Sequence, residues 1–143
     1  MANYQIEQGS IHEKFLKSRA KIQLFGGGFA NGKTTSACVK AIQVAKDYPG
    51  ANILVARATM RKLADSIGKE FYKWLPPDWI KSSTKSGTEG MTTHLKNGSI
   101  INFRYVQQQS RGGTTSSSNL LSATYDLAVI DQIDDPEFHY KDL

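Results

Sequence analysis

The amino-acid sequence predicts an α/β fold in which helices flank a mostly parallel β-sheet. The first observation is that Gly27 is followed by four residues and then by Gly32-Lys33-Thr34, the spacing of a phosphate-binding P-loop. The second is that a helical pattern follows this loop and an apolar, strand-like run follows that helix. The third is a later apolar run that ends in Asp131. Strand, loop, helix and strand in this order form a βαβ unit with parallel strands.

The composition is that of one globular domain. The chain has 143 residues, of which 39% are hydrophobic and 22% charged, so it can bury one core and is too short for two typical domains. A net charge of +5 favours a phosphate-rich partner, either nucleic acid or nucleotide, without specifying one. No apolar run is long enough to span a membrane, so we expect no membrane-spanning segment and no membrane partner. The single cysteine, Cys38, is expected to be a core thiol rather than a nucleophile.

Residues 1–19 are expected to form a lead-in segment that ends in a short helix. Ser10 and Glu13 have the spacing of a capping box. The helix has three residues on its apolar edge: Ile11, Phe15 and Leu16. Three polar side chains have groups that can read the edge of an adenine base: Gln5, Gln8 and His12. Solvent exposure explains these three at least as well.

Residues 20–56 are expected to form the βαβ unit around the P-loop. A strand-like run over residues 20–25 places Ile22 and Leu24 on one face. Backbone amides of a glycine-rich loop can surround a polyphosphate, and we expect Lys33 to reach its β and γ phosphates. The predicted nucleotide-binding residues are Gly27, Gly28, Phe29, Ala30, Asn31, Gly32, Lys33, Thr34 and Thr35.

A helix and a strand complete this unit. Apolar residues recur at intervals of three and four between Lys33 and Tyr48, and Pro49-Gly50 ends the predicted helix. The compact apolar run over residues 52–56 is typical of a strand buried on both faces of a parallel sheet.

A second amphipathic helix is predicted over residues 59–75, and Pro76-Pro77 ends it. Its apolar positions predict five core side chains: Met60, Leu63, Ile67, Phe71 and Trp74. Its opposite face carries four charged side chains: Lys62, Asp65, Lys69 and Lys73. This face is either an ordinary solvated surface or one that follows the phosphates of a nucleic acid.

The middle of the chain is expected to hold a loop, a β-hairpin insertion and a second loop. Residues 80–89 are polar and predict a loop. Asn97-Gly98 is a strong turn signal that separates the predicted strands 91–96 and 99–106. Residues 107–119 are of low complexity and predict a flexible loop.

The second half of the site is predicted at the end of the chain. Residues 125–131 form an apolar strand that ends in a carboxylate, which is the Walker B arrangement. A strand beside the P-loop strand would bring Asp131 toward a magnesium ion that Thr34 also binds. The sequence therefore predicts ATP and Mg²⁺ as ligands, with Thr34 and Asp131 as metal-binding residues.

Hydrolysis also needs a group that orients or deprotonates the attacking water. Many P-loop ATPases of the ASCE type place a glutamate directly after the Walker B aspartate, where this chain has Gln132. An amide cannot take the proton, although it can position a water molecule. If the chain turns helical after residue 130, Asp134 or Asp135 would lie one turn from Asp131. The water-handling role is therefore divided among Gln132, Asp134 and Asp135.

Several stretches together resemble the ATPase domain of the large terminase subunit, the DNA-packaging motor of tailed bacteriophages. The stretches that carry the resemblance follow the order found in that family: Phe15 to Ser18, Ile22 to Phe25, Gly26 to Gly28, Gly32 to Thr35, Ile53 to Arg57, Leu63 to Ile67 with Phe71, Arg111-Gly112, and the strand to Asp131. The P-loop is general to many ATPases, whereas Arg57 and the pattern from Leu63 to Ile67 are more particular.

The resemblance implies a motor that hydrolyses ATP in the host cytoplasm to drive double-stranded DNA into a procapsid. It further implies a homo-oligomeric ring on the portal protein, with a small terminase subunit nearby. The family also has a nuclease domain, which we expect to be absent from residues 1–143, so that the chain is an incomplete, N-terminal part of the ATPase domain.

Two departures from the family pattern concern hydrolysis. Many relatives have an arginine in the Walker A loop, where this chain has Phe29-Ala30. A charge-stabilising arginine must then be Arg57, Arg111 or one from a neighbouring subunit, although Arg111 can equally be a solvated side chain. The second departure is Gln132. Two alternatives therefore stay open: another nucleic-acid-dependent ATPase, such as a helicase, and a nucleotide-binding module with little hydrolysis.

Overall fold

A computed structural model describes residues 5–27, 31–57, 63–86, 90–105 and 123–132 of the chain. Within these ranges the fold is a five-stranded sheet with helices packed on it, which confirms the α/β class. No helix in the described part of the chain is long and apolar enough to cross a bilayer. The predicted flexible loop over residues 107–119 lies outside the described residues.

The sheet has the strand order β2-β3-β4-β1-β5. Its strands are β1 (Asn52–Arg57), β2 (Ile80–Ser86), β3 (Gly90–Leu95), β4 (Ile100–Tyr105) and β5 (Leu127–Ile130). β1 pairs in parallel with both β4 and β5, whereas β3 pairs antiparallel with both β2 and β4. The sheet is therefore mixed rather than mostly parallel, because the predicted hairpin is part of the main sheet. A two-residue turn makes its strands antiparallel, and β4 continues the sheet beside β1.

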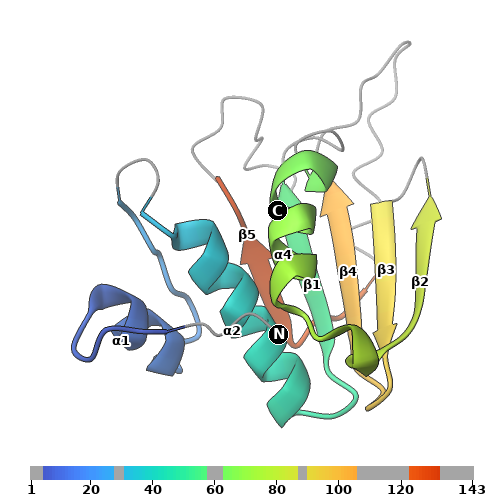
Figure 1. The fold of residues 1–143 in the computed structure, drawn as a ribbon, viewed down its shortest axis with the longest axis horizontal. Helices are drawn as coiled ribbons and strands as arrows, with labels where there is room; N and C mark the ends of the chain where they lie inside the picture. Colours follow the sequence, from blue (N-terminus) through green and yellow to red (C-terminus); the bar gives the residue numbers. More distant parts are fainter. Residues whose placement is uncertain (1–4, 28–30, 58–62, 87–89, 106–122, 133–143) are drawn as a thin grey trace.

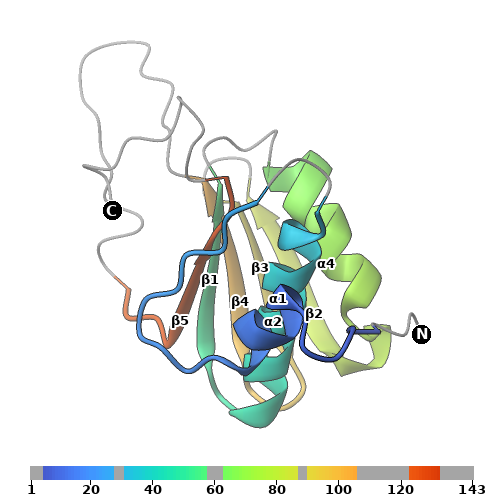
Figure 2. The ribbon, with the colours of Figure 1, turned by 90° about the vertical axis from the view of Figure 1, so that its left-hand side faces the viewer.

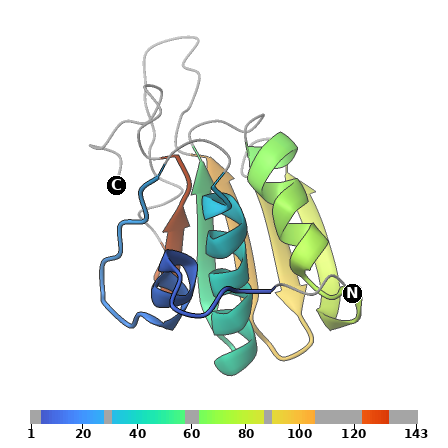
Figure 3. The same cartoon turned by 60° about the vertical axis from the view of Figure 1, so that its left-hand side comes forward.

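The helices lie along one face of this sheet (Figures 1 and 3). They are α1 (Ile11–Lys17), α2 (Lys33–Asp47), the π-helix η1 (Leu63–Gly68), α4 (Lys69–Trp74) and the short 3₁₀-helix η2 (Pro77–Trp79). α2 and α4 pack against each other, and α1 packs against α2, as Figure 2 shows. The predicted helix from Lys33 is confirmed, and the described part of the second predicted helix is divided between η1 and α4.

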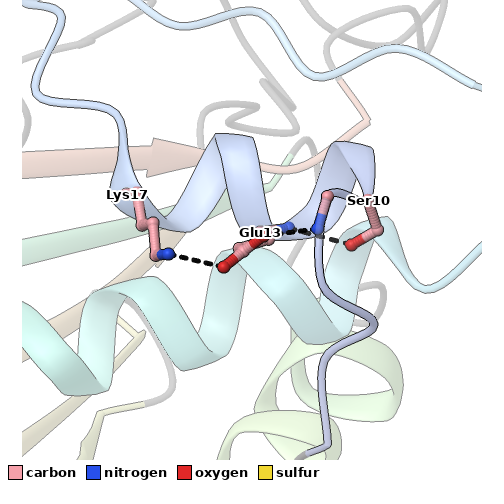
Figure 4. A network of polar contacts seen from close by, with 4 residues as sticks. Ser10, Glu13 and Lys17 are labelled. Carbon is pink, nitrogen blue, oxygen red and sulfur yellow. Dashed lines mark hydrogen bonds and ion pairs between the residues drawn. The ribbon is translucent and has the colours of Figure 1, made fainter.

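The lead-in helix α1 begins with the predicted cap (Figure 4). The Ser10 hydroxyl accepts a hydrogen bond from the Glu13 backbone N–H at 3.2 Å. The Glu13 carboxylate accepts one from the Gly9 backbone N–H at 2.6 Å and also pairs with Lys17. The capping-box prediction is confirmed, with the Gly9 amide in the position expected for the Ser10 amide.

The core lies between the helices and the sheet. Ile67 and Phe71, two of the predicted core residues of the second helix, are fully buried, and Trp74 packs against the core. The Phe71 ring meets the Phe103 ring of β4 edge to face, with 5.1 Å between ring centres. Cys38 is buried in the same cluster, which confirms a core thiol, and burial raises the pKa of that thiol. Met60, Lys62 and the side chains of Leu63 and Asp65 lie outside the described part of the structure.

The hairpin turn holds the C-terminal end of α2. Asn97 Nδ2 donates a hydrogen bond to the Ala45 carbonyl at 2.7 Å, and Ser99 Oγ donates to the same carbonyl at 2.9 Å. Ser99 Oγ also lies 3.2 Å from the Tyr48 carbonyl. The last carbonyls of an α-helix have no N–H donor within the helix. The side chains of Asn97 and Ser99 therefore bind carbonyl groups that would otherwise need water.

The strand predicted over residues 20–25 is wrong. Ile22 and Leu24 are 91% and 86% exposed, and the segment is irregular. Gln23 Nε2 donates to the Ser18 and Ala20 carbonyls, each at 3.1 Å. The buried Lys40 ammonium donates to the Ser18 carbonyl at 2.9 Å and to Gln23 Oε1 at 2.7 Å. Such side-chain bonds to nearby backbone compete with a β-ladder and hold the segment in a curled path.

The loop predicted over residues 80–89 is also wrong in its first part. Residues 80–86 form β2, which pairs with β3 from Ile80 to Ser86. The side chains of residues 81–85 are exposed, so this edge strand has no apolar face to mark it in the sequence. Pairing with β3 overrides the weak strand propensity of a polar segment, and lysines on an edge strand discourage pairing with other chains.

Candidate nucleotide-binding site

Three elements meet at one end of the sheet. α2 begins near the end of the sheet at which the parallel strands β1 and β5 also end (Figure 1). Ala56 of β1 pairs with Ile130 of β5, so the next residues, Arg57 and Asp131, emerge together at that edge. The Asp131 backbone N–H extends this ladder by donating to the Ala56 carbonyl at 3.1 Å.

The structure brings Thr34 and Asp131 into contact, although 97 positions separate them in the sequence. Thr34 Oγ1 lies 3.2 Å from Asp131 Oδ1 and 3.4 Å from Oδ2, so its hydroxyl donates to the carboxylate. Arg57 Nε pairs with Asp131 Oδ2 at 3.0 Å. Arg57 and Asp131 are 5% and 9% exposed, which makes this a buried ion pair next to the first turn of α2.

Of the loop before α2, the structure describes Gly26, Gly27, Asn31 and Gly32. Gly32 is the residue before the helix, with a φ of 68° in the left-handed region, which glycine adopts without strain. Lys33 Nζ donates to the Gly27 carbonyl at 2.8 Å, so the ammonium folds back across the loop. A Cβ at Gly27 would lie 3.5 Å from Asn31 Nδ2. Gly28, Phe29 and Ala30 lie outside the described residues.

The first turn of α2 supplies further donors. The Ser36 backbone N–H donates to the Gly32 carbonyl at 2.9 Å, the first hydrogen bond of the helix. The N–H groups of residues 33–35 therefore have no acceptor within the helix. Such amides, together with the positive end of the helix dipole, favour an anion at this position.

Glu70 of α4 is a site residue that sequence reasoning missed. Thr35 Oγ1 donates to Glu70 Oε1 at 2.6 Å, and Trp74 Nε1 donates to the same oxygen at 2.7 Å. Partial burial acts to raise the pKa of Glu70, but the hydrogen bonds from Thr35 and Trp74 and the positive charge of Lys73 together outweigh it, so the pKa lies below its usual value. Only the spacing of Glu70 and Trp74 on one helix face was visible in the sequence; nothing there marked the contact with Thr35.

His12 also lies beside this turn. His12 Nδ1 is 2.7 Å from Ser36 Oγ, and its ring meets the Phe25 ring edge to face at 5.2 Å between centres. A Cβ at Gly32 would lie 3.5 Å from His12 Cε1. Gln5 and Gln8, the other two residues considered for base recognition, are exposed.

The water-handling candidates are only partly described. Gln132 directly follows Asp131, is exposed and has a φ of 55°, a left-handed conformation that is uncommon outside glycine. Asp134, Asp135 and Arg111 lie outside the described residues.

Two oxygen-bearing side chains of the described site, Thr34 and Asp131, could together hold a magnesium ion. In the described ranges no group of three or more His, Cys, Asp or Glu residues could hold a metal ion. The Thr34 hydroxyl and the Asp131 carboxylate are hard oxygen ligands in contact with each other. Magnesium in nucleotide sites usually takes one or two such protein ligands and completes its shell with water and phosphate oxygens.

Comparison of the chain with protein-family models, with curated proteins and with solved structures found no match. What the site does must therefore be argued from its own residues.

Proposed function

We propose that the chain binds ATP with magnesium where α2, β1 and β5 meet, as part of a P-loop ATPase domain. The observation that carries this proposal is the contact of Thr34 with Asp131 at 3.2 Å. Two motifs predicted separately, and each common by itself, supply the two halves of one site.

Each residue then has a role that follows from its position. The amides of the first turn of α2 bind phosphate oxygens, and the Lys33 ammonium leaves the Gly27 carbonyl to pair with them. Thr34 and Asp131 would hold the magnesium ion, which supplies charge neutralisation to the phosphates when bound. Arg57 orients the Asp131 carboxylate through their ion pair.

The larger assignment, to the ATPase motor of a phage terminase, rests on the family resemblance. It names double-stranded DNA as the substrate that is moved, and the portal protein and small terminase subunit as partners in a ring. The net charge of +5 is compatible with a DNA partner. DNA unwinding by the full protein, without any dependence on procapsids, would favour the helicase alternative instead.

A second candidate function is nucleotide binding with little hydrolysis. Gln132 is the observation that favours it, because this exposed side chain follows Asp131 where a proton-accepting glutamate is common. Its amide can orient a water molecule but cannot accept the proton.

Measuring affinity and turnover separately tests both candidates. We expect Lys33→Ala to weaken the binding of a fluorescent ATP analogue by at least about tenfold, because one cation is lost beside a polyanion. Lys46→Ala is the matched control, since Lys46 is exposed in the last turn of the same helix. Equal affinities of the two variants would refute the site, whereas tight binding without phosphate release would select the non-hydrolysing module.

A further inference from the structure

The first turn of α2 is held from two directions by two carboxylates. Successive residues of a helix project about 100° apart. Thr34 reaches Asp131 after β5, and the next residue, Thr35, reaches Glu70 on α4. Beyond the effect of burial, the negative charges of Glu70 and Asp131 both raise the pKa of Cys38, one turn further along α2. Both carboxylates therefore face the same stretch of this helix.

The Glu70 carboxylate joins two helices of the fold. Its Oε1 accepts two hydrogen bonds, at 2.6 Å from the Thr35 hydroxyl and at 2.7 Å from the Trp74 indole. Hydrogen bonds to an ionised carboxylate are stronger than neutral ones and lower its basicity. A carboxylate used in this way is a poor general base and a good structural link.

Helix α4 connects this link to the far half of the sheet. Phe71, next to Glu70 in the sequence, packs edge to face on Phe103 of β4. The neighbouring Tyr72 hydroxyl contacts Thr93 of β3 and lies 3.2 Å from Ser83 Oγ of β2. A set of contacts therefore runs from the first turn of α2, through Thr35 and Glu70, to strands β4, β3 and β2.

We propose that Glu70 is a positioning residue that transmits nucleotide occupancy from the first turn of α2 to helix α4. This inference rests on the proposed function, because it needs a ligand on the amides of residues 33–35. A shift of that turn changes the contact between Thr35 and Glu70, and the Trp74 indole shares the same acceptor oxygen. The NMR signal of the Trp74 indole N–H should therefore respond to changes in the contact between Thr35 and Glu70.

The experiment follows the two tryptophan indole N–H signals by ¹⁵N NMR during titration with ATP and MgCl₂. Trp79 serves as the internal reference, because it lies beside Lys46 at the opposite end of α2, and Trp79→Phe assigns the two signals. We expect the Trp74 signal to move and to saturate at the ATP concentration that saturates the fluorescent-analogue assay. The Trp79 signal should stay within the line width.

Substitutions at Thr35 test whether the contact between Thr35 and Glu70 is needed for the shift of the Trp74 signal. We expect Thr35→Val to abolish the nucleotide-dependent shift of Trp74, because the hydroxyl that joins the first turn of α2 to Glu70 is lost. Thr35→Ser keeps the hydroxyl and should restore the shift. Should Thr35→Val fail to fold by circular dichroism, Glu70→Gln is measured instead. It keeps the acceptor oxygen without its charge, so we expect it to shift the Trp74 signal before ATP is added and to reduce the response to ATP.

The outcomes distinguish this inference from the proposed function. Absence of any ATP binding by the unmodified chain overturns both. ATP binding with a stationary Trp74 signal, or an unchanged response in Thr35→Val or Glu70→Gln, overturns the role of Glu70 and leaves the nucleotide site standing.

Discussion

Replacing Asp131 by asparagine should destabilise the protein even when no nucleotide is bound. The substitution leaves the Arg57 guanidinium buried beside a neutral group, since Arg57 is only 5% exposed. Two unit charges at the observed 3.0 Å interact by about 5.5 kcal/mol at an effective dielectric constant of about 20. Asparagine keeps an oxygen that can accept the hydrogen bond from Thr34, so we place the loss near the lower end of the range for broken buried pairs, at about 3 kcal/mol.

Urea unfolding followed by circular dichroism measures this loss directly. Asp126→Asn provides the matched control, because Asp126 is an exposed carboxylate just before the same strand. It accepts one hydrogen bond, from the Asn52 backbone N–H, which an asparagine oxygen can also accept. We expect the control to lose less than about 1 kcal/mol.

The double variant Arg57→Met/Asp131→Leu tests whether the loss in Asp131→Asn comes from the buried charge of Arg57. If the cost of Asp131→Asn comes from removing the negative charge beside a buried guanidinium, replacing both charges by apolar side chains should recover most of the free energy of unfolding. It should also abolish the dependence of ATP binding on magnesium. A loss below about 0.5 kcal/mol for Asp131→Asn would show that solvent reaches the pair, and would refute its description as buried.

Two further predictions concern stability. Gly90→Ala should lower the free energy of unfolding, measured in urea, by at least about 3 kcal/mol, because a Cβ there would lie 2.0 Å from the Phe103 carbonyl oxygen. Gly9 also has a positive φ but has open space around it, so Gly9→Ala should lower the free energy of unfolding by only about 1 kcal/mol. Equal losses would contradict the steric argument. The lowered pKa of Glu70 predicts stability that is present above its unfolded value, near 4.5, and is lost as pH falls through the lower folded value. Glu70→Gln should therefore flatten the acid side of the plot of melting temperature against pH, and an unchanged slope would show that this carboxylate is not stabilised by folding.

The elements with strong local signals could be predicted from the sequence. The three- and four-residue spacing of α2, the apolar run of β1 and the Asn97-Gly98 turn each specify a structure with little help from the rest of the chain. The contact of Thr34 with Asp131 was also predicted, but from a strand over residues 20–25 that does not form. Asp131 instead follows β5, which pairs in parallel with β1.

The elements whose structure depends on distant partners could not be predicted from the sequence. Ile22 and Leu24 alternate like a strand, but the Lys40 ammonium, which comes from another element, holds the surrounding backbone in a curled path. β2 has almost no apolar side chains, and its strand conformation comes from pairing with β3. The role of Glu70 depends on the packing of α4 against α2, which a one-dimensional pattern does not contain.

The hydrogen bonds from Asn97 and Ser99 to the Ala45 carbonyl have a mechanical consequence for α2. They fix the end of the helix that is farthest from Thr34, at a distance of roughly 16 Å given about 1.5 Å of rise per residue. A displacement of the first turn would therefore tilt the helix about this end more readily than slide it along its own axis. The hairpin thus anchors α2 at the end opposite the proposed nucleotide site.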